Sequence, residues 1–243
     1  MIINASGLDF AALNKALREC ADDCDTVIEN CLGQRFIASG MNLVGRNLRI
    51  EGIPGNALGA YLCGGSITVS GNAQDAVGDT MNDGTITVCG SIGDAVGYAM
   101  RGGEIYIKGN AGYRAGIHMK EYEGKKPVIV IGGRAGSFLG EYQAGGLIIV
   151  LGMNTDGRPA VGNFPCTGMH GGKMIIRGST ENIRFPDGVT LREATEEDLC
   201  EIRPYIERFC GAFGYCADEM MKSRFSVIMP DSKNPYKKMY APN

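Results

Sequence analysis

Pairs of apolar residues separated by one residue recur along the middle of the chain at a fixed interval. Four pairs lie 19 residues apart: Leu48/Ile50, Ile67/Val69, Ile86/Val88 and Ile105/Ile107. Such alternation is typical of a β-strand with one buried face, since successive side chains point to opposite sides. Three further pairs follow at longer intervals: Val128/Val130, Ile148/Val150 and Met174/Ile176. The pattern therefore predicts seven copies of one strand.

Glycine follows the same period. The chain has 243 residues and 37 glycines, of which 32 lie between Gly40 and Gly178. The longest series is Gly40, Gly59, Gly78, Gly97 and Gly116, with others at Gly52, Gly71, Gly90 and Gly109 and at Gly65, Gly84 and Gly103. Strands this short are stable only when stacked on their neighbours, and glycine accepts the positive φ of a tight corner. The predicted fold is all-β, a single-stranded parallel β-helix of about seven coils with a 19-residue period.

Two features interrupt or accompany the repeat. The period is broken by insertions at about 121–127 and 154–164, which we expect to form surface loops. A column of large apolar residues also repeats, and is predicted to stack inside the coil: Leu62, Met81, Met100, Met119 and Met169.

The segment before the repeat has a different pattern. Residues 8–20 carry apolar side chains at helical spacing, and residues 26–30 and 35–38 have the composition of strands. An uncovered end of a β-helix is an exposed sheet edge, which favours aggregation. We therefore expect residues 1–39 to form an α/β cap, followed by the β-helix over residues 40–178.

Residues 179–243 are expected to form a helical extension with a docking tail. Thr195 and Asp198 resemble a capping box at the start of a helix, and Pro204 is expected to kink or split that helix. From Ser223 onward the composition fits an extended arm lying on a surface, or a flexible solvated tail.

The residues that could carry chemistry are few. Asp75 and Asp94 repeat at a corner with Asn56 and Tyr113, and are interpreted either as carboxylates for acid–base catalysis or as turn residues that bond their own backbone. The second interpretation is preferred. His118 and His170 are assigned structural roles at repeat corners, because neither has a partner at metal-ligand or nucleophile spacing.

Cysteines and glycine motifs add no clear site. The spacing of Cys20, Cys24 and Cys31 allows a metal or iron–sulfur cluster, but simple packing of buried thiols is preferred. The Gly171-Gly172-Lys173 stretch lacks the remaining residues of a phosphate-binding loop. We predict no catalytic, cofactor-binding or metal residues and no cofactor.

Composition excludes several classes of protein. A formal net charge of −3 and a pI near 5.5 argue against nucleic-acid binding. Nine scattered cysteines do not form a secreted disulfide framework, and the chain begins without the pattern of a signal peptide. No apolar run is long enough to span a membrane. We expect a cytoplasmic protein with no membrane partner.

Several phrases of the repeat resemble one family. The stretch from Ser70 to Gly78 resembles the G-x-A-N-D-x-V-G phrase of the C-terminal (GXGXG) domain of the glutamate synthase large subunit. The stretch from Gly140 to Gly152 is similar to that domain's E-Y-M-T-G-G-x-V-V-V-L-G, and Thr167–Gly172 to its G-M-T-G-G corner. The same glycine-rich β-helix occurs as a separate subunit of formylmethanofuran dehydrogenase.

The resemblance implies a right-handed β-helix and a non-catalytic role. In glutamate synthase, glutamine is hydrolysed in an amidotransferase domain and 2-oxoglutarate is aminated and reduced in an FMN-containing barrel, while the β-helix domain holds these domains together. The chain has neither a catalytic N-terminal cysteine nor a barrel-sized segment. We therefore expect a scaffold subunit, with the FMN-domain and glutamine amidotransferase subunits as partners.

Two other interpretations stay open. One is the β-helix subunit of a molybdenum or tungsten formylmethanofuran dehydrogenase. The other, of a different class, is a free-standing β-helix enzyme acting on carbohydrate, which would depend on Asp75 and Asp94. A homo-oligomer is compatible with each of the three interpretations.

Overall fold

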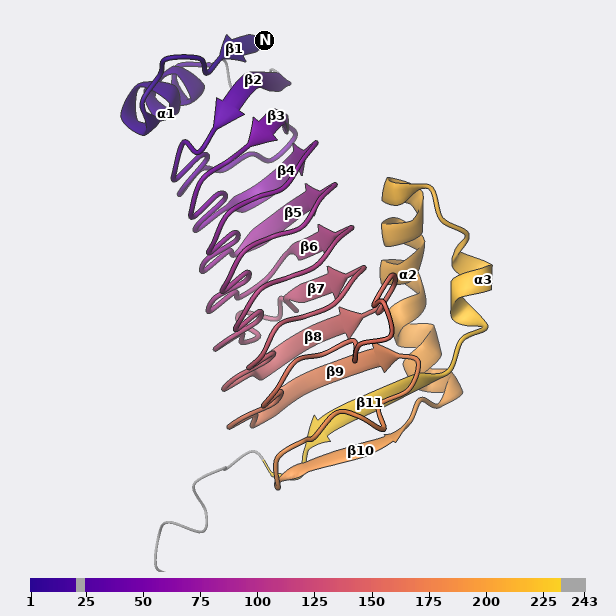
Figure 1. The fold of residues 1–243 in the computed structure, drawn as a ribbon. Helices are drawn as coiled ribbons and strands as arrows, with labels where there is room; N and C mark the ends of the chain where they lie inside the picture. Colours follow the sequence, from indigo (N-terminus) through magenta and orange to yellow (C-terminus); the bar gives the residue numbers. More distant parts are fainter. Residues whose placement is uncertain (21–24, 233–243) are drawn as a thin grey trace, which may run out of the picture.

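The computed structural model describes residues 1–20 and 25–232. Its elements, in chain order, are β1 (Ile2–Asn4), α1 (Phe10–Arg18), β2 (Thr26–Leu32), β3 (Asn47–Ile53), β4 (Cys63–Val69), β5 (Asp83–Val88), β6 (Glu104–Ile107), β7 (Val128–Ile131), β8 (Ala144–Val150), β9 (Gly171–Arg177), β10 (Val189–Glu193), α2 (Glu196–Phe213), α3 (Ala217–Met221) and β11 (Phe225–Pro230). The strands form one 11-stranded sheet in the order β1-β2-β3-β4-β5-β6-β7-β8-β9-β11-β10. Figure 1 shows them stacked along a single axis.

The seven strands predicted from the repeat are β3 to β9, and all of them pair in parallel. Six turns join them, so the solenoid has about six turns where seven coils were predicted. Aligned residues such as Ile67, Ile86 and Ile105 confirm the 19-residue interval. The interval lengthens to 24 between Ile105 and Ile129 and to 26 between Ile148 and Met174, which confirms the two predicted insertions.

Two details of the predicted register are wrong. The inward pair of β7 is Ile129 and Ile131, which align with Ile105 and Ile107, whereas the predicted Val128 and Val130 point to the other side of the sheet. All four residues are apolar because both faces of β7 are buried, so alternation could not define the register there. Gly40 is also out of series. The N–H of Gly40 donates to Ala60 O, and the N–H of Tyr61 donates to Asp79 O in the same way. Gly40 therefore aligns with Tyr61 and not with Gly59.

The corners show why glycine recurs. In one coil Ala76, Gly78 and Thr80 all have positive φ, so the left-handed conformation alone does not demand glycine. A Cβ on Gly78 would lie 2.5 Å from Ile105 Cδ1, and the same close approach repeats between Gly97 and Ile129. Glycine is therefore required where the corner meets an isoleucine of the neighbouring coil.

The predicted internal column is buried. Leu62, Met81, Met100 and Met119 are fully shielded from solvent, and Met169 is nearly so. Gln143 occupies the place in this column between Met119 and Met169. The backbone N–H of each of these three residues donates to the carbonyl three positions earlier in the chain. Gln143 Nε2 donates to Gly145 O and Gly146 O, two carbonyls beside the bulge between β8 and β9, whereas its Oε1 has no partner within the described residues.

The N-terminal cap contains one helix and two strands. Helix α1 is capped by Asp9, whose Oδ1 accepts a hydrogen bond from Ala12 N, and it buries Leu13 and Leu17 at the end of the internal core. Strands β1 and β2 extend the parallel sheet. Residues 35–38, predicted as a strand, instead form a turn. Their apolar side chains fit a corner as well as a strand, and Phe36 and Ala38 have positive φ.

The C-terminal region returns to the sheet. The predicted capping box is confirmed, since Thr195 and Asp198 exchange side-chain-to-backbone hydrogen bonds at the start of α2. The predicted split at Pro204 is wrong, because α2 is one continuous helix and Pro204 lies on its exposed side, where water can bind the carbonyl released by the ring. A kink at Pro204 stays a prediction. Strand β11 then inserts antiparallel between β9 and β10. The division at residues 39 and 178 stays a prediction.

The sheet therefore separates two cores. The side chains inside the coils form one continuous cluster from Ile3 to Ile228. The outer faces of β6 to β9 and β11 form a second cluster with α2, centred on Phe209, Ile206 and Ile202. Figure 1 shows α2 lying along the stacking direction beside these strands.

Candidate functional site

Asp75 and Asp94 lie at a coil corner, where their carboxylates bind the backbone of the next coil. Asp75 Oδ1 accepts a hydrogen bond from Asp94 N at 2.8 Å, and Asp94 Oδ1 accepts one from Tyr113 N at 2.7 Å. Asn56 starts the column by accepting from Asp75 N. The preferred structural interpretation is correct in kind but wrong in partner, because each side chain bonds the next coil and not its own turn.

A second column of this kind was not predicted from the sequence. Asn72 Oδ1 accepts a hydrogen bond from Ser91 N, Ser91 Oγ from Asn110 N, and Asn110 Oδ1 from Arg134 N, at 2.8 to 3.0 Å. The 19-residue spacing of Asn72, Ser91 and Asn110 was the available signal. The side chains of these columns accept hydrogen bonds from backbone N–H groups at the corners, where few backbone carbonyls are in position to accept them.

The two histidines occupy different positions in the coil. His118 lies at a left-handed corner and stacks on Tyr142, with ring centroids 5.2 Å apart, while Tyr98 meets it edge-on at 5.9 Å. His170 lies two residues beyond the corner that aligns with His118, and its Nδ1 contacts Gly168 O at 3.0 Å. The prediction of one shared corner is therefore wrong for His170.

The corners also present aromatic rings to solvent. Exposed or half-exposed rings from successive coils form what we call the aromatic edge: Phe36, Tyr61, Tyr98, Tyr113, His118, Phe138, Tyr142 and Phe164. Phe138 contacts Phe164 at 5.3 Å, and Arg114 lies over the ring of Phe138. The sequence did not predict this surface, because its residues fall in four different columns of the repeat.

Cysteines do not come together in the described part of the chain. Cys20 and Cys31 are buried and free, and Cys24 lies outside the described residues. Among residues 1–20 and 25–232, no three His, Cys, Asp or Glu side chains are close enough to hold a metal ion. Burial raises the pKa of Cys31 to about 11 and that of Cys166 to about 12, so both stay protonated thiols at neutral pH.

Lys173, the residue that ends the Gly-Gly-Lys stretch, takes part in an ion-pair cluster between the sheet and α2. Its Nζ lies 2.9 Å from Asp198 Oδ1 and 2.5 Å from Glu201 Oε2. Lys126 from the first insertion also pairs with Glu201, and Arg192 from β10 pairs with Asp198 at 2.5 Å. The cluster ties α2 to three separate segments: the first insertion, β9 and β10.

The cluster strongly favours ionised carboxylates. Hydrogen bonds from Arg192, and after it from Lys173, hold the pKa of Asp198 well below its usual range, although burial opposes them. Burial alone would raise the pKa of Glu201, but hydrogen bonds from Lys126 and Lys173 outweigh it and lower that pKa. Each carboxylate has lysine or arginine partners that hold it in place, so the cluster is suited to anchoring a helix.

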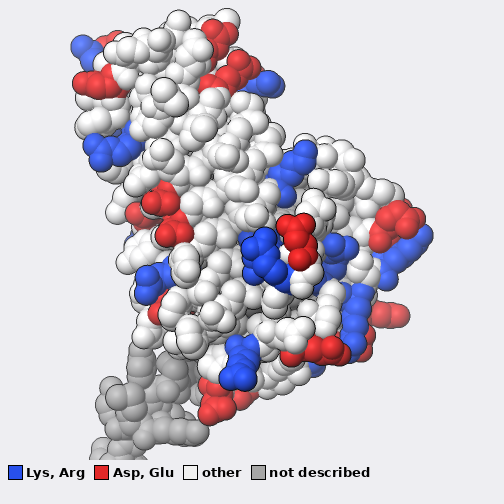
Figure 2. Space-filling view, viewed as in Figure 1, with Lys and Arg blue, Asp and Glu red and all other residues white. Residues whose placement is uncertain are grey.

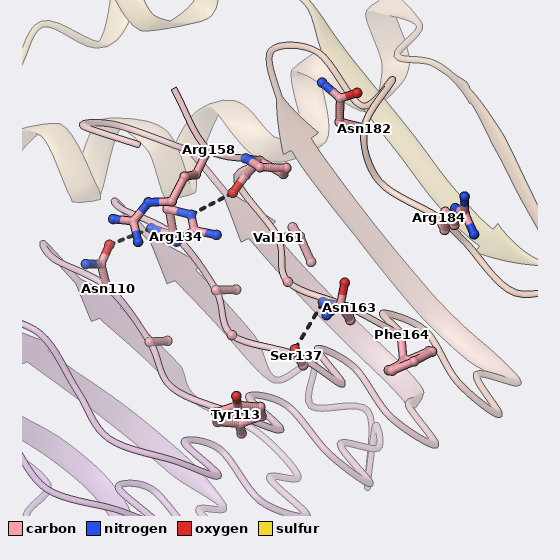
Figure 3. A pocket seen from close by; sticks show the side chains of 15 residues that line it. Asn110, Tyr113, Arg134, Ser137, Arg158, Val161, Asn163, Phe164, Asn182 and Arg184 are labelled. Atoms are coloured by element: carbon pink, nitrogen blue, oxygen red, sulfur yellow. Dashed lines mark hydrogen bonds between the residues drawn. The ribbon is translucent and has the colours of Figure 1, made fainter. Parts of the chain in front are cut away.

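A groove of about 770 Å³ lies where the second insertion crosses the coil corners. It is lined by Arg134, Arg158 and Arg184, by Asn110, Asn163 and Asn182, and by Tyr113, Ser137, Val161 and Phe164, with no Asp or Glu among the lining residues. Figure 3 shows Arg134 and Arg158 at one end and Arg184 at the other. We call it the arginine groove.

Charge elsewhere is unevenly distributed. In the view of Figure 2 much of the solenoid surface is free of Lys, Arg, Asp and Glu, whereas both signs gather over the C-terminal region. None of the helices in the described residues is long and apolar enough to cross a bilayer.

A stack of short parallel strands with left-handed glycine corners defines a class of repeat proteins, the glycine-rich β-solenoids. The model of the family described as "GXGXG motif" matches residues 11–232, and the chain belongs to that family. This finding confirms the resemblance seen in the repeated phrases.

Proteins similar to the chain include one sequence relative and one solved structure. An uncharacterized protein of Methanocaldococcus jannaschii, MJ1350, is 45% identical over 253 aligned positions, which cover 100% of this chain and 97% of that protein. Among solved structures, a chain of the formyltransferase/hydrolase complex (FhcABCD) from Methylorubrum extorquens, determined with methylofuran, has a TM-score of 0.60 at 22% identity. The match covers 85% of this chain and 78% of that one and establishes a shared fold.

Proposed function

We propose that this chain is a non-catalytic scaffold subunit of a multi-subunit enzyme. The observation that carries the proposal is the aromatic edge, a row of exposed rings held on a rigid stack of coils. Exposed tyrosines such as Tyr61 and Tyr98 are typical of the residues that dominate binding at protein interfaces. Each corner carboxylate accepts a hydrogen bond from the backbone of the next coil, which fits a supporting role.

The partners that the sequence favours are those of glutamate synthase. The phrases of the GXGXG domain span the coils that present most of the aromatic edge, and family membership supports the comparison. We infer that the chain holds an FMN-containing synthase subunit and a glutamine amidotransferase subunit together in the cytoplasm. The C-terminal segment from residue 179 would contribute to the same assembly.

The second candidate is the β-helix subunit of a formylmethanofuran dehydrogenase. It is supported by the fold shared with a chain of a formyltransferase/hydrolase complex, a protein that is itself part of an assembly. A free-standing carbohydrate enzyme has less support, since one oxygen of Asp75 and one of Asp94 accept backbone hydrogen bonds.

Purification of the tagged full-length chain from its native host tests the proposal. We expect stoichiometric recovery of an FMN-containing polypeptide and a glutamine amidotransferase, identified by mass spectrometry and flavin absorbance. Recovery of a molybdenum- or tungsten-containing protein would replace the first assignment with the second. Recovery of the chain alone, at native expression level and low salt, would overturn the scaffold role.

Matched variants locate the docking surface. Tyr98→Arg places a charge in the middle of the aromatic edge, and we expect it to reduce partner recovery at least tenfold. Leu32→Arg, at a more exposed apolar residue in the N-terminal cap, is the control and should leave recovery unchanged. Equal recovery with both variants would show that the aromatic edge is not the interface.

A further inference from the structure

The arginine groove contains positive charges that no carboxylate of its own lining neutralises. Three guanidinium groups line it, and no carboxylate does. The whole chain is acidic, with a formal net charge of −3, so this local excess is not a consequence of composition. Arginines that stabilise a fold are usually paired with carboxylates, as Arg192 is with Asp198 in the cluster beneath α2.

Arg134 is held in place by the groove itself. Its Nε donates to Pro159 O at 2.6 Å, and its backbone N donates to Asn110 Oδ1 at 2.8 Å. Its two terminal nitrogens make no hydrogen bond or ion pair within the described residues. This arrangement fixes the plane of the guanidinium and leaves donors free, as bidentate recognition of an oxyanion requires.

The other two arginines are available to a ligand. Arg158, next to Pro159, faces only Asp156 among the described carboxylates, at 3.7 Å, and both side chains are more than half exposed, so the pairing is weak. Arg184 is exposed and has no hydrogen-bond or ion-pair partner in residues 1–20 and 25–232. The groove thus has a paired positive end at Arg134 and Arg158 and a single positive charge at Arg184 (Figure 3).

The floor between the two ends suits an organic ligand. Val161 is buried there, and the rings of Phe164 and Tyr113 are more than half exposed. Asn163 and Asn182 add amide groups that can donate to or accept from a polar substituent. A volume of about 770 Å³ lies within the ordinary range of small-molecule sites.

We propose that the arginine groove binds a small organic anion with two acidic groups, either carboxylates or phosphate esters. One acidic group binds between Arg134 and Arg158, the other binds Arg184, and the carbon skeleton lies over Val161 and Phe164. The proposal is independent of the identity of the partner subunits. Bound there, the ligand would bridge the second insertion, which carries Arg158, and the segment after β9, which carries Arg184.

Calorimetric titration of the full-length chain at low salt tests the site. The probes are glutarate and citrate for carboxylates, fructose 1,6-bisphosphate for phosphate esters, and inorganic phosphate as a single-centre anion. We expect at least one two-centre probe to bind at least tenfold more tightly than inorganic phosphate. Preference for the carboxylates or for the bisphosphate then identifies the acidic group.

Two variants and a control connect the binding to the groove. Arg184→Gln should weaken the best probe at least tenfold, and it leaves the fold intact because Arg184 has no partner to lose among the described residues. Arg134→Gln should do the same, with its thermal stability measured alongside. Arg49→Gln, at an exposed arginine in the N-terminal half, should bind like the unmodified chain. Unchanged affinity in Arg184→Gln, or no saturation by any probe below 10 mM (about −3 kcal/mol of binding free energy), would overturn the proposal.

Discussion

At the scale of single residues, the corner glycines carry a packing requirement. Alanine, threonine, tyrosine and histidine all adopt positive φ in this chain, as Ala76, Thr80 and His118 show. Gly97 differs from these residues in the direction of its Cβ position, because a side chain there would point inward at Ile129. The corners at Gly59, Gly78, Gly97 and Gly116 each leave a space that is filled by the end of an isoleucine from a neighbouring coil.

The first prediction concerns Gly97→Ala. The new Cβ would lie 2.5 Å from Ile129 Cδ1 at a φ of 65°, so overpacking and backbone strain add. We expect the free energy of unfolding, measured with urea, to fall by about 3 kcal/mol. Gly211→Ala is the control, since no atom lies within 4 Å of its Cβ position in α2, and it should stabilise the protein by about 1 kcal/mol. Equal effects would refute the packing explanation.

At the scale of elements, the strands could be predicted and the attachment of α2 could not. The apolar pairs predict the strands reliably, because the same pattern recurs in several copies and chance would have to produce it in each of them. The register failed at β7, where both faces are buried and Val128 to Ile131 are uniformly apolar. The ion pairs of Lys126 and Lys173 with α2 join residues 25 to 75 positions apart, and no local pattern encodes such distances.

The second prediction concerns the pH dependence of that attachment. Asp198→Asn removes a buried carboxylate bound by Arg192 and Lys173, and should lower stability at pH 7 by about 2 kcal/mol. Because the folded-state pKa of Asp198 is depressed, the stabilisation is complete above the unfolded value of about 3.9 and declines as pH falls below it. The two proteins should therefore converge in acid, as followed by urea unfolding at several pH values.

Asp187→Asn is the matched control for this measurement. Asp187 is exposed and makes no hydrogen bond or ion pair in the described part of the chain, so the substitution should leave the pH profile unchanged. A constant difference between Asp198→Asn and the unmodified chain from pH 7 down to pH 2 would show that the carboxylate charge contributes nothing.

At the scale of the whole molecule, one sheet divides two cores, and only one of them follows from the repeat. The internal core continues through every coil, whereas the outer core exists only where α2 covers β6 to β9. On the uncovered half, outer-face residues such as Thr68 and Thr87 are polar and half-exposed. The change from threonine to apolar residues on the outer face at β6 was the available signal for the position of α2.

The third prediction follows from the shared sheet. Ile148 and Ile149 are adjacent in β8 but belong to the internal and outer cores respectively. Replacing either by alanine should lower the free energy of unfolding by about 2 to 5 kcal/mol, because each is fully buried. Thr68→Ala, on the uncovered outer face, should change it by about 0.5 kcal/mol. A small effect of Ile149→Ala alone would mean that α2 is loosely attached.

The two insertions described above leave the stacking of the strands intact, although they add five and seven residues to their turns. Length added within a turn therefore changes a loop, whereas length added as a whole 19-residue unit would add a strand. Each added strand would separate the two ends of the molecule by a further step of about 4.8 Å. The number of coils therefore sets the length of the molecule along the stacking direction. Gain or loss of one coil would reset the distance between whatever binds at its two ends, with both binding surfaces unchanged.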